Sequence, residues 1–382
     1  MLVVWRDVAT RPRSTRRPRA PEPVVDAGLL TGLDALVASA TRRGLHVLLT
    51  PTGPGPLWAS PCRRGTVADR QACRPAPADF ERLVATLGRR YPQVRSWAVW
   101  NEPNNSRWLT PQFTSEERPA SPAHYRRLVA AAARALRATG HGGDELLAGE
   151  TAPLGRVTGA PATRPMIPGP FLRALLCRGC RLPGVTGLSH HAYTRGGTQR
   201  PRYPSLPGEL AVSGLAELTR IAGRLPVHLT EGGWQTTPPD PVFGVPLGRQ
   251  GEYLNEAEWM VRNRPRVRSF PQYLLHDEVP TGSFQSGLRF AAGDPKPALD
   301  AYRLPIWVVR RGRQVTVWGR VRPARAGAPD AVIDRRLPGR RWTAVRTVAA
   351  RQDVLVRLTS PRAQWRLRWN GATSRTAAEA KR

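Results

Sequence analysis

Seven short apolar runs recur at intervals of 40 to 50 residues along this chain, and amphipathic segments separate them. Thr31 and Gly44 can cap the two ends of one such segment. Ser121 opens another segment, which Gly140 closes. Strands that alternate with helices indicate parallel strands joined by crossovers. The runs are LVVW (2–5), HVLLT (46–50), SWAVWN (96–101), LLAGE (146–150), GLSHH (187–191), VHLTE (227–231) and QYLLH (272–276).

The number of these strand–helix units limits which folds the chain can adopt. An eight-stranded α/β barrel spends ~31 residues on each strand–helix unit, over ~250 residues. Seven units with some long loops predict a (β/α)8 TIM-type barrel over residues 1–303 that lacks its first strand and helix. Because the chain opens directly on a strand, we expect a natural start further upstream, before the missing strand, the missing helix and a signal peptide.

The pattern changes after Arg303, where helical periodicity gives way to strands that alternate apolar and polar residues. We predict a small antiparallel β-sandwich over residues 304–371, as an accessory domain, and a disordered tail over 372–382. At this spacing the tryptophans of the segment are typical of a sandwich core, and a sugar-binding face is the alternative. This interpretation concerns four of the segment's tryptophans, Trp318, Trp342, Trp365 and Trp369.

The 382 residues carry a formal net charge of +31, nearly all of it from arginines spread along the chain. Such a chain attracts polyanions. The sequence has no zinc-finger spacing, RNA-binding aromatic motif or compact basic tail, so we expect no specific nucleic-acid partner. No apolar run reaches the ~20 residues of a membrane span. We therefore expect no membrane span, and we expect a monomer.

The four cysteines come in two close pairs. This arrangement predicts two local disulfides, Cys62–Cys73 and Cys177–Cys180, and hence an extracellular or cell-surface protein. A four-cysteine zinc site is one alternative, although the first pair is too widely spaced for a usual zinc motif. A redox CxxC at Cys177 and Cys180 is another, but no thioredoxin-like context surrounds it.

Two of the predicted strands end in glutamates that suit acid–base chemistry. Glu102 follows the third run and Glu231 ends the sixth, three strand–helix units later. In a barrel the active site forms at the carboxyl ends of the strands, and these two positions face each other across the mouth. Two carboxyl groups across a sugar-sized cleft are what glycoside hydrolysis requires. Glu150 also ends a strand and is the competitor of Glu231, but its strand is the neighbour of the one before Glu102.

Other polar and aromatic residues surround these strand ends. Asn101 can bind a sugar hydroxyl, and His191 and Tyr193 can hold the nucleophile ionised and aimed. Flat indoles on the loops can stack on sugar faces. No His-Glu-x-x-His pattern is present, so we expect neither a catalytic metal nor a cofactor. The candidate indoles are Trp58, Trp108 and Trp234.

The segments WNEPN (100–104) and LTEGGW (229–234), with HAY (191–193), resemble the signatures of glycoside hydrolase clan A, which includes families 5 and 39. The resemblance covers about residues 1–303 and implies a retaining (β/α)8 O-glycosyl hydrolase acting on a poly- or oligosaccharide. It implies Glu102 as the general acid/base, Glu231 as the nucleophile and Asn101 as the contact to the 2-hydroxyl. Retention predicts carboxyl groups ~5–5.5 Å apart.

The sequence departs from the clan at its start. The clan usually carries an arginine on strand 2 near the nucleophile, and the corresponding position lies at or before Met1. A start assigned too late would explain this departure. The alternative is a catalytically inactive, truncated barrel that acts as a carbohydrate-binding or scaffold protein, because a barrel without its first strand leaves unpaired strand edges.

Overall fold

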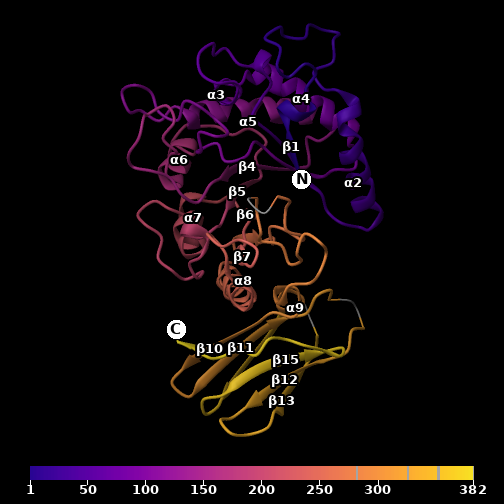
Figure 1. Cartoon of the computed structure of the whole chain (residues 1–382), viewed down its shortest axis with the longest axis vertical. Coiled ribbons are helices and arrows are strands. Elements are labelled where there is room, and N and C mark those ends of the chain that lie inside the picture. Colours follow the sequence, from indigo (N-terminus) through magenta and orange to yellow (C-terminus); the bar gives the residue numbers. More distant parts are fainter. Residues whose placement is uncertain (281–282, 325–326, 351–352, 382) are drawn as a thin grey trace. The chain divides into compact units, whose positions relative to one another are not determined.

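The computed structural model describes residues 1–280, 283–324, 327–350 and 353–381, which form two compact units (Figure 1). The first, called the sheet unit here, comprises Met1–Ala192, Pro204–Glu231 and Arg266–Pro271. The second, called the sandwich unit, comprises Tyr193–Tyr203, Gly232–Pro265 and Gln272–Arg382. The units thus interleave along the chain. The predicted boundary between residues 303 and 304 stays a prediction.

The sheet unit contains seven parallel strands in the order β1-β2-β3-β4-β5-β6-β9, which is their order along the chain. The predicted parallel α/β domain is confirmed at this level. Within the described residues β1 and β9 are the two edges of an open sheet, so the strands do not close into a ring. The strands are β1 (Leu2–Val4), β2 (Leu48–Thr52), β3 (Ser96–Ala98), β4 (Glu145–Thr151), β5 (Gly187–His191), β6 (Val227–Glu231) and β9 (Val267–Ser269).

The last strand lies upstream of the predicted run 272–276. Strand β9 joins the sheet where Val267 pairs with Val227 of β6. Pro271 then follows, and a proline has no N–H to donate to a strand ladder. Residues 272–276 form no regular strand and belong to the sandwich unit. The predicted run 272–276 is therefore a loop, and the last strand of the sheet is the shorter VRS segment before it.

Helices connect consecutive strands of the sheet unit (Figure 1). The longest is α5, which starts at Ser121, as predicted, and buries Tyr125, Leu128 and Leu136. At α2 the capping residue is Asp26, whose carboxylate accepts from Gly28 N at 2.9 Å at the start of a 3-10 turn that leads into the helix. The helices are α1 (Trp5–Val8), α2 (Thr31–Arg42), α3 (Val67–Ala72), α4 (Pro77–Arg90), α5 (Ser121–Ala138), α6 (Pro168–Leu175) and α7 (Leu215–Ile221), with 3-10 turns η1 (Ala27–Leu30), η2 (Leu57–Ala59) and η4 (Val212–Gly214).

The sandwich unit contains two four-stranded sheets, β14-β11-β10-β17 and β13-β12-β15-β16. Side chains from both sheets form one core, in which Ile306, Ile333 and Trp365 are fully buried. This confirms the predicted β-sandwich. The other elements of the unit are the 3-10 turn η3 (Arg195–Gly197), the pair β7 (Thr236–Thr237) and β8 (Val245–Pro246), and helices α8 (Leu247–Arg262) and α9 (Pro297–Arg303). The sandwich strands are β10 (Ile306–Arg311), β11 (Gln314–Arg320), β12 (Ala331–Arg336), β13 (Thr343–Val348), β14 (Asp353–Thr359), β15 (Gln364–Trp369), β16 (Ala372–Thr373) and β17 (Ala380–Lys381).

The carboxyl-terminal segment differs from the predicted disordered tail. Strand β16 pairs with β15, and β17 pairs with β10. Glu379 explains why the segment is held, because its carboxylate pairs with Arg310 and accepts from Trp365 Nε1 at 3.0 Å. Small and polar residues carried the signal for disorder, but tertiary contacts outweigh it here.

The cysteines lie at disulfide-bonding distance in the two predicted pairs, Cys62–Cys73 and Cys177–Cys180. Both pairs belong to the sheet unit, and both are compatible with an extracellular protein. Within the described residues, no helix combines the length and the apolar character needed to cross a membrane. The same residues contain no group of three or more His, Cys, Asp or Glu arranged to hold a metal ion.

Candidate active site

Three glutamates and one histidine meet at one edge of the parallel sheet. His191 and Glu231 are the last residues of β5 and β6, Glu150 is the last but one of β4, and Glu102 follows β3. Parallel strands bring their carboxyl ends to the same edge, so residues far apart in the sequence become neighbours there. All four residues belong to the sheet unit. We call them the His191 cluster.

The imidazole of His191 lies at the centre of this cluster. Its Nδ1 is 3.2 Å from an oxygen of Glu102 and 3.6 Å from an oxygen of Glu231. Its Nε2 is 3.3 Å from an oxygen of Glu150. The imidazole is fully buried, so neither nitrogen is left to water. Glu102 and Glu231 therefore share one ring nitrogen of His191, and the predicted role of His191 stays a prediction.

The electrostatics of the cluster favour a charged imidazole. Burial lowers the pKa of His191, but the charge of Glu231 and the hydrogen bonds to Glu102 and Glu150 outweigh it, and the pKa lies well above 6.5. Burial raises the pKa of Glu150, but the hydrogen bond from His191 and other contacts outweigh it, and the pKa lies below 4.5. Both shifts favour the pair of an imidazolium and an ionised Glu150.

The three carboxylates differ in their access to solvent. The side chains of Glu102 and Glu231 are 18% and 14% exposed, whereas that of Glu150 is 3% exposed. Glu150 is also held by Thr230, whose hydroxyl donates to its Oε1 at 2.9 Å. Glu102 and Glu231 are thus the two carboxylates of the cluster that are partly open to solvent, and Glu150 is the buried partner of His191. The sequence offered one signal for this third carboxylate, since LLAGE ends in Glu as VHLTE does.

The backbone around Glu150 is fixed by its neighbours. The Tyr125 hydroxyl donates to Val99 O at 2.7 Å and accepts from Gly149 N at 2.8 Å, which ties β4 to the end of β3. Gly149 has φ +131°, and a Cβ there would lie 2.2 Å from Ser189 O. Only glycine fits this close approach. The chain then turns so that Glu150 can reach His191.

Both Glu102 and Glu150 adopt left-handed backbone conformations, with φ of 41° and 44°. Side chains rarely tolerate this region, and such residues gather at functional sites. Glu102 N donates to Glu150 O at 2.7 Å, so the two turns hold each other. Asn105 Nδ2 donates to the second carboxylate oxygen of Glu102 at 3.1 Å. These contacts fix the direction of the Glu102 side chain.

Two asparagines of the WNEPNN segment have different environments. Asn104 is fully used, because its amide nitrogen donates to Ala152 O and Met166 O at 3.1 and 2.9 Å and its oxygen accepts from Ala152 N at 2.8 Å. Asn101 is 4% exposed, and its Oδ1 has no hydrogen-bond partner among the described residues. A buried amide oxygen without a partner is unusual. Asn104 therefore holds the loop, and Asn101 is the residue with spare capacity for a ligand.

The predicted aromatic platforms lie in different places. Trp58 is 3% exposed, packs edge-on against Trp5, and donates to Thr10 O at 2.9 Å. Trp108 is partly exposed, and its carbonyl accepts from Trp100 Nε1. Trp58 is thus closed off by packing, because the loop after β2 folds into an aromatic core. Of the two candidate tryptophans in the sheet unit, Trp108 is the one that is partly exposed.

The remaining predicted site residues, Tyr193 and Trp234, belong to the sandwich unit. Trp234 is 1% exposed and donates to Gln199 O at 2.9 Å, so its indole is part of a packed core. Tyr193 stacks on Phe284 with ring centroids 6.1 Å apart and meets Tyr273 edge-on. Sequence patterns could not assign these side chains to a unit, because the chain passes between the units on either side of them.

No protein-family model and no curated protein matches this chain. Among solved structures, the chain is similar to a thermostable family GH51 α-L-arabinofuranosidase from Thermotoga petrophila RKU-1. The TM-score is 0.44 at 10% sequence identity, and the alignment covers 93% of this chain and 85% of that one. This likeness is too low to carry an argument. It also gives no support to the narrower assignment to families 5 and 39.

Proposed function

We propose that this chain is a glycoside hydrolase that cleaves O-glycosidic bonds through Glu102 and Glu231. One observation carries the proposal: two partly exposed carboxylates share one nitrogen of a buried histidine at the carboxyl edge of a parallel sheet. Two atoms within 3.6 Å of the same nitrogen lie close together. A carboxyl separation of ~5–5.5 Å, which a retaining mechanism uses, is compatible with this arrangement.

In this mechanism Glu231 attacks the anomeric carbon while Glu102 donates a proton to the leaving oxygen. A covalent glycosyl-enzyme forms, and Glu102 then takes a proton from the water that releases the sugar. The WNEPN and LTEGGW segments, which resemble the clan A signatures, assign the roles in this order. Asn101, with its unpartnered amide oxygen, suits a hydrogen bond to the hydroxyl beside the reacting carbon.

His191 acts on both carboxylates in this proposal. As an imidazolium it stabilises the ionised nucleophile before attack, and its Nδ1–H fixes one oxygen of Glu102. Glu150 acts through His191, since it holds the second ring nitrogen and favours the charged form. Glu150 is thus a positioning residue rather than a group that touches the sugar.

A second candidate function is carbohydrate binding without catalysis. The open edges of the sheet at β1 and β9 favour it, because unpaired strand edges leave a parallel domain less constrained. Carbohydrate binding differs from the proposed hydrolysis in one measurable respect. A binding protein retains sugars without turning them over, whatever residue stands at position 102 or 231.

The test is turnover of a panel of 4-nitrophenyl glycosides by the full chain and three variants. We expect Glu102→Gln and Glu231→Gln to lower kcat about 10²–10⁴-fold, as loss of an acid–base or nucleophilic group does. Glu145→Gln is the matched control, because Glu145 lies at the other end of β4 and is only half-buried. We expect it to keep wild-type turnover. Equal turnover by all four proteins would exclude the proposed pair.

Rescue of alanine variants by azide distinguishes the acid/base residue from the nucleophile. With a glycoside that has a good leaving group, azide should restore turnover to Glu102→Ala and give a glycosyl azide of retained configuration. With Glu231→Ala the azide product should have inverted configuration, because azide then replaces the nucleophile. Proton NMR of the products distinguishes these outcomes, and the same product from both variants would contradict the assignment.

A further inference from the structure

A basic hollow of the sandwich unit lies where β12 ends and β15 begins. Ile333 and Leu367 of β12 and β15 point into the core, so their alternating neighbours point outward. Arg336 and Gln364 lie opposite each other on this outer face. Together with Arg340 and Arg362 they line a hollow of about 510 Å³. The volume is in the range of small-ligand sites.

The arginines of this hollow lack carboxylate partners. Among the described residues, no Asp or Glu forms an ion pair with Arg336, Arg340 or Arg362. On the same face, Arg366 and Arg368 both pair with Asp334, at 2.8 and 2.7 Å. The face therefore has a part where one carboxylate faces two arginines and a part where the arginines have no carboxylate partner.

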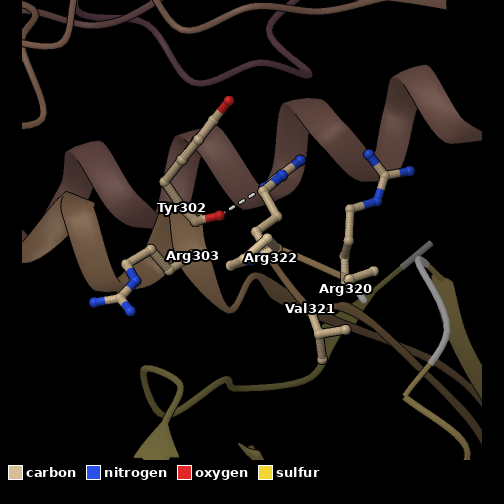
Figure 2. Close-up of a pocket in the computed structure, with 7 residues that line it drawn as sticks. Tyr302, Arg303, Arg320, Val321 and Arg322 are labelled. Carbon is tan, nitrogen blue, oxygen red and sulfur yellow. Dashed lines mark hydrogen bonds between the residues drawn. The ribbon is translucent and has the colours of Figure 1, made fainter. Parts of the chain in front are cut away.

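A second hollow in the same unit provides a contrast (Figure 2). It too is lined by arginines, and Figure 2 shows Arg322 bonded to Tyr302 O. There, however, Arg322 pairs with Glu258 at 2.7 Å and Arg320 pairs with Asp353 at 2.9 Å. Two of the three guanidinium groups of this hollow therefore have an anion, and Arg303 forms no ion pair among the described residues. The hollow around Arg336 differs because none of its three arginines has a carboxylate partner there.

The guanidinium of Arg336 is held in place before any ligand arrives. Its Nε donates to Gln364 Oε1 at 2.9 Å, and its carbon lies 4.7 Å from the centre of the Trp342 ring. Arg366 lies 4.5 Å from the same ring. A guanidinium that stacks on an aromatic ring loses little further freedom when it binds a planar anion. The arrangement suits carboxylates and sulfates, which Arg binds through two parallel hydrogen bonds.

We propose that this hollow binds the carboxylate or sulfate groups of an anionic polysaccharide. The proposal rests on the proposed glycosidase function, because that function makes a saccharide the expected polymer. Arg336, Arg340 and Arg362 supply the charge, and Gln364 can bond a neighbouring hydroxyl. This site would bind the protein to an acidic glycan through residues other than those of the His191 cluster.

A nucleic acid fits this hollow less well. Proteins that bind single strands stack successive bases on open aromatic rings. Here two guanidinium groups already lie against Trp342, the aromatic residue beside the hollow. The ring is therefore used to hold arginines, and the chemistry that remains is a cluster of donors for anionic groups.

The test is affinity electrophoresis of the full chain in gels that contain polygalacturonate, dextran sulfate, neutral dextran or double-stranded DNA. We expect retardation by polygalacturonate or dextran sulfate and none by neutral dextran. The triple variant Arg336→Gln, Arg340→Gln, Arg362→Gln should lose affinity about 10-fold or more, since each lost charged hydrogen bond matters. Retardation by polygalacturonate alone would identify uronates, and by dextran sulfate alone would identify sulfate esters.

The matched control removes the same charge from exposed arginines elsewhere in the sandwich unit, with Arg311→Gln, Arg313→Gln, Arg346→Gln. Equal losses in the two triple variants would mean general attraction by the net charge of +31 and would overturn the proposal. Retardation by DNA that the first triple variant removes would overturn it too. Turnover of a neutral 4-nitrophenyl glycoside should be the same in the wild type and both triple variants. Binding without any turnover would refute the glycosidase and leave the anion site standing.

Discussion

The sheet unit and the sandwich unit each bury a charged cluster, but they balance the charge differently. In the sandwich unit Lys296 is 1% exposed and donates to Asp277 Oδ1 and Thr236 Oγ1 at 2.7 Å and to Gln285 O at 3.0 Å. One cation faces one anion, and its three hydrogens are used. In the sheet unit one imidazole faces three carboxylates, two of them partly open to solvent.

This difference separates a structural charge cluster from a reactive one. In the buried pair the three donors of Lys296 are satisfied, and the one spare group is Asp277 Oδ2, which has no hydrogen-bond partner among the described residues. Three carboxylates around one buried imidazole give groups with displaced pKa values, His191 and Glu150, and such groups are common at catalytic sites. The left-handed backbone at Glu102 and Glu150 occurs in the reactive cluster. The predictions below test this contrast.

The largest effect is expected from Lys296→Met in the sandwich unit. It leaves Asp277 buried without its cation, which costs about 3–5 kcal/mol of the free energy of unfolding. Urea denaturation followed by circular dichroism measures it. The double variant Lys296→Met, Asp277→Leu should recover much of the loss. Arg249→Met, which breaks an exposed pair with Glu252, should cost under about 1 kcal/mol. If Lys296→Met were as stable as the wild type, the Lys296–Asp277 pair would not be a structural charge cluster, which would contradict the contrast between the two units.

The next effect compares the two asparagines beside Glu102. Asn104→Ala removes three hydrogen bonds and leaves buried backbone groups unpaired, so we expect a loss of about 2–3 kcal/mol in the free energy of unfolding. Asn101→Ala removes an amide oxygen that has no partner among the described residues. It should lower kcat/KM about 10-fold or more with little change in stability, if that oxygen binds substrate.

Chemical denaturation measures the stability of the two variants. Turnover of a 4-nitrophenyl glycoside measures their kcat/KM. Loss of stability in Asn101→Ala and not in Asn104→Ala would reverse the roles assigned to these residues.

The smallest effect concerns pH. The pKa of His191 is raised in the folded chain, so its contribution to stability is present below the pKa of unfolded histidine and is lost as pH rises through the folded value. Activity that needs the imidazolium falls over that same rise. Glu150→Gln removes one of the carboxylates that raise this pKa. The alkaline limb of kcat against pH should therefore move to lower pH.

A second pH effect comes from Glu150 itself. Its pKa is lowered, so its contribution to stability is present above the pKa of an unfolded glutamate and is lost as pH falls through the folded value. Glu150→Gln should remove this acid dependence while the residual turnover persists. An unmoved alkaline limb would mean that Glu150 does not act through His191. NMR of the imidazole protons gives the same titration without turnover.

Much of the fold was predictable from local patterns. The parallel strands β1 to β6 and helices such as α5 followed from apolar runs and capping residues, because these signals lie within a few residues of each other. The run 272–276 misled because it is apolar but irregular, and β9 is a short segment whose pairing with β6 is a non-local contact. The ordered segment at 372–381 was missed for a similar reason, since Arg310 and Trp365 hold Glu379 from far along the chain.

The sequence by itself determined which glutamates end or follow strands, and therefore that Glu102 and Glu231 arrive at one edge of a parallel sheet. Only the tertiary structure decided that Glu150 joins them through His191 and that Trp58 is packed away. The physical reason is that the positions of strands, and the parallel direction that the intervening helices imply, follow from short-range periodicity. Burial, ion pairing and pKa depend on side chains brought together from strands some 40 residues apart or more, whose contacts no local pattern specifies.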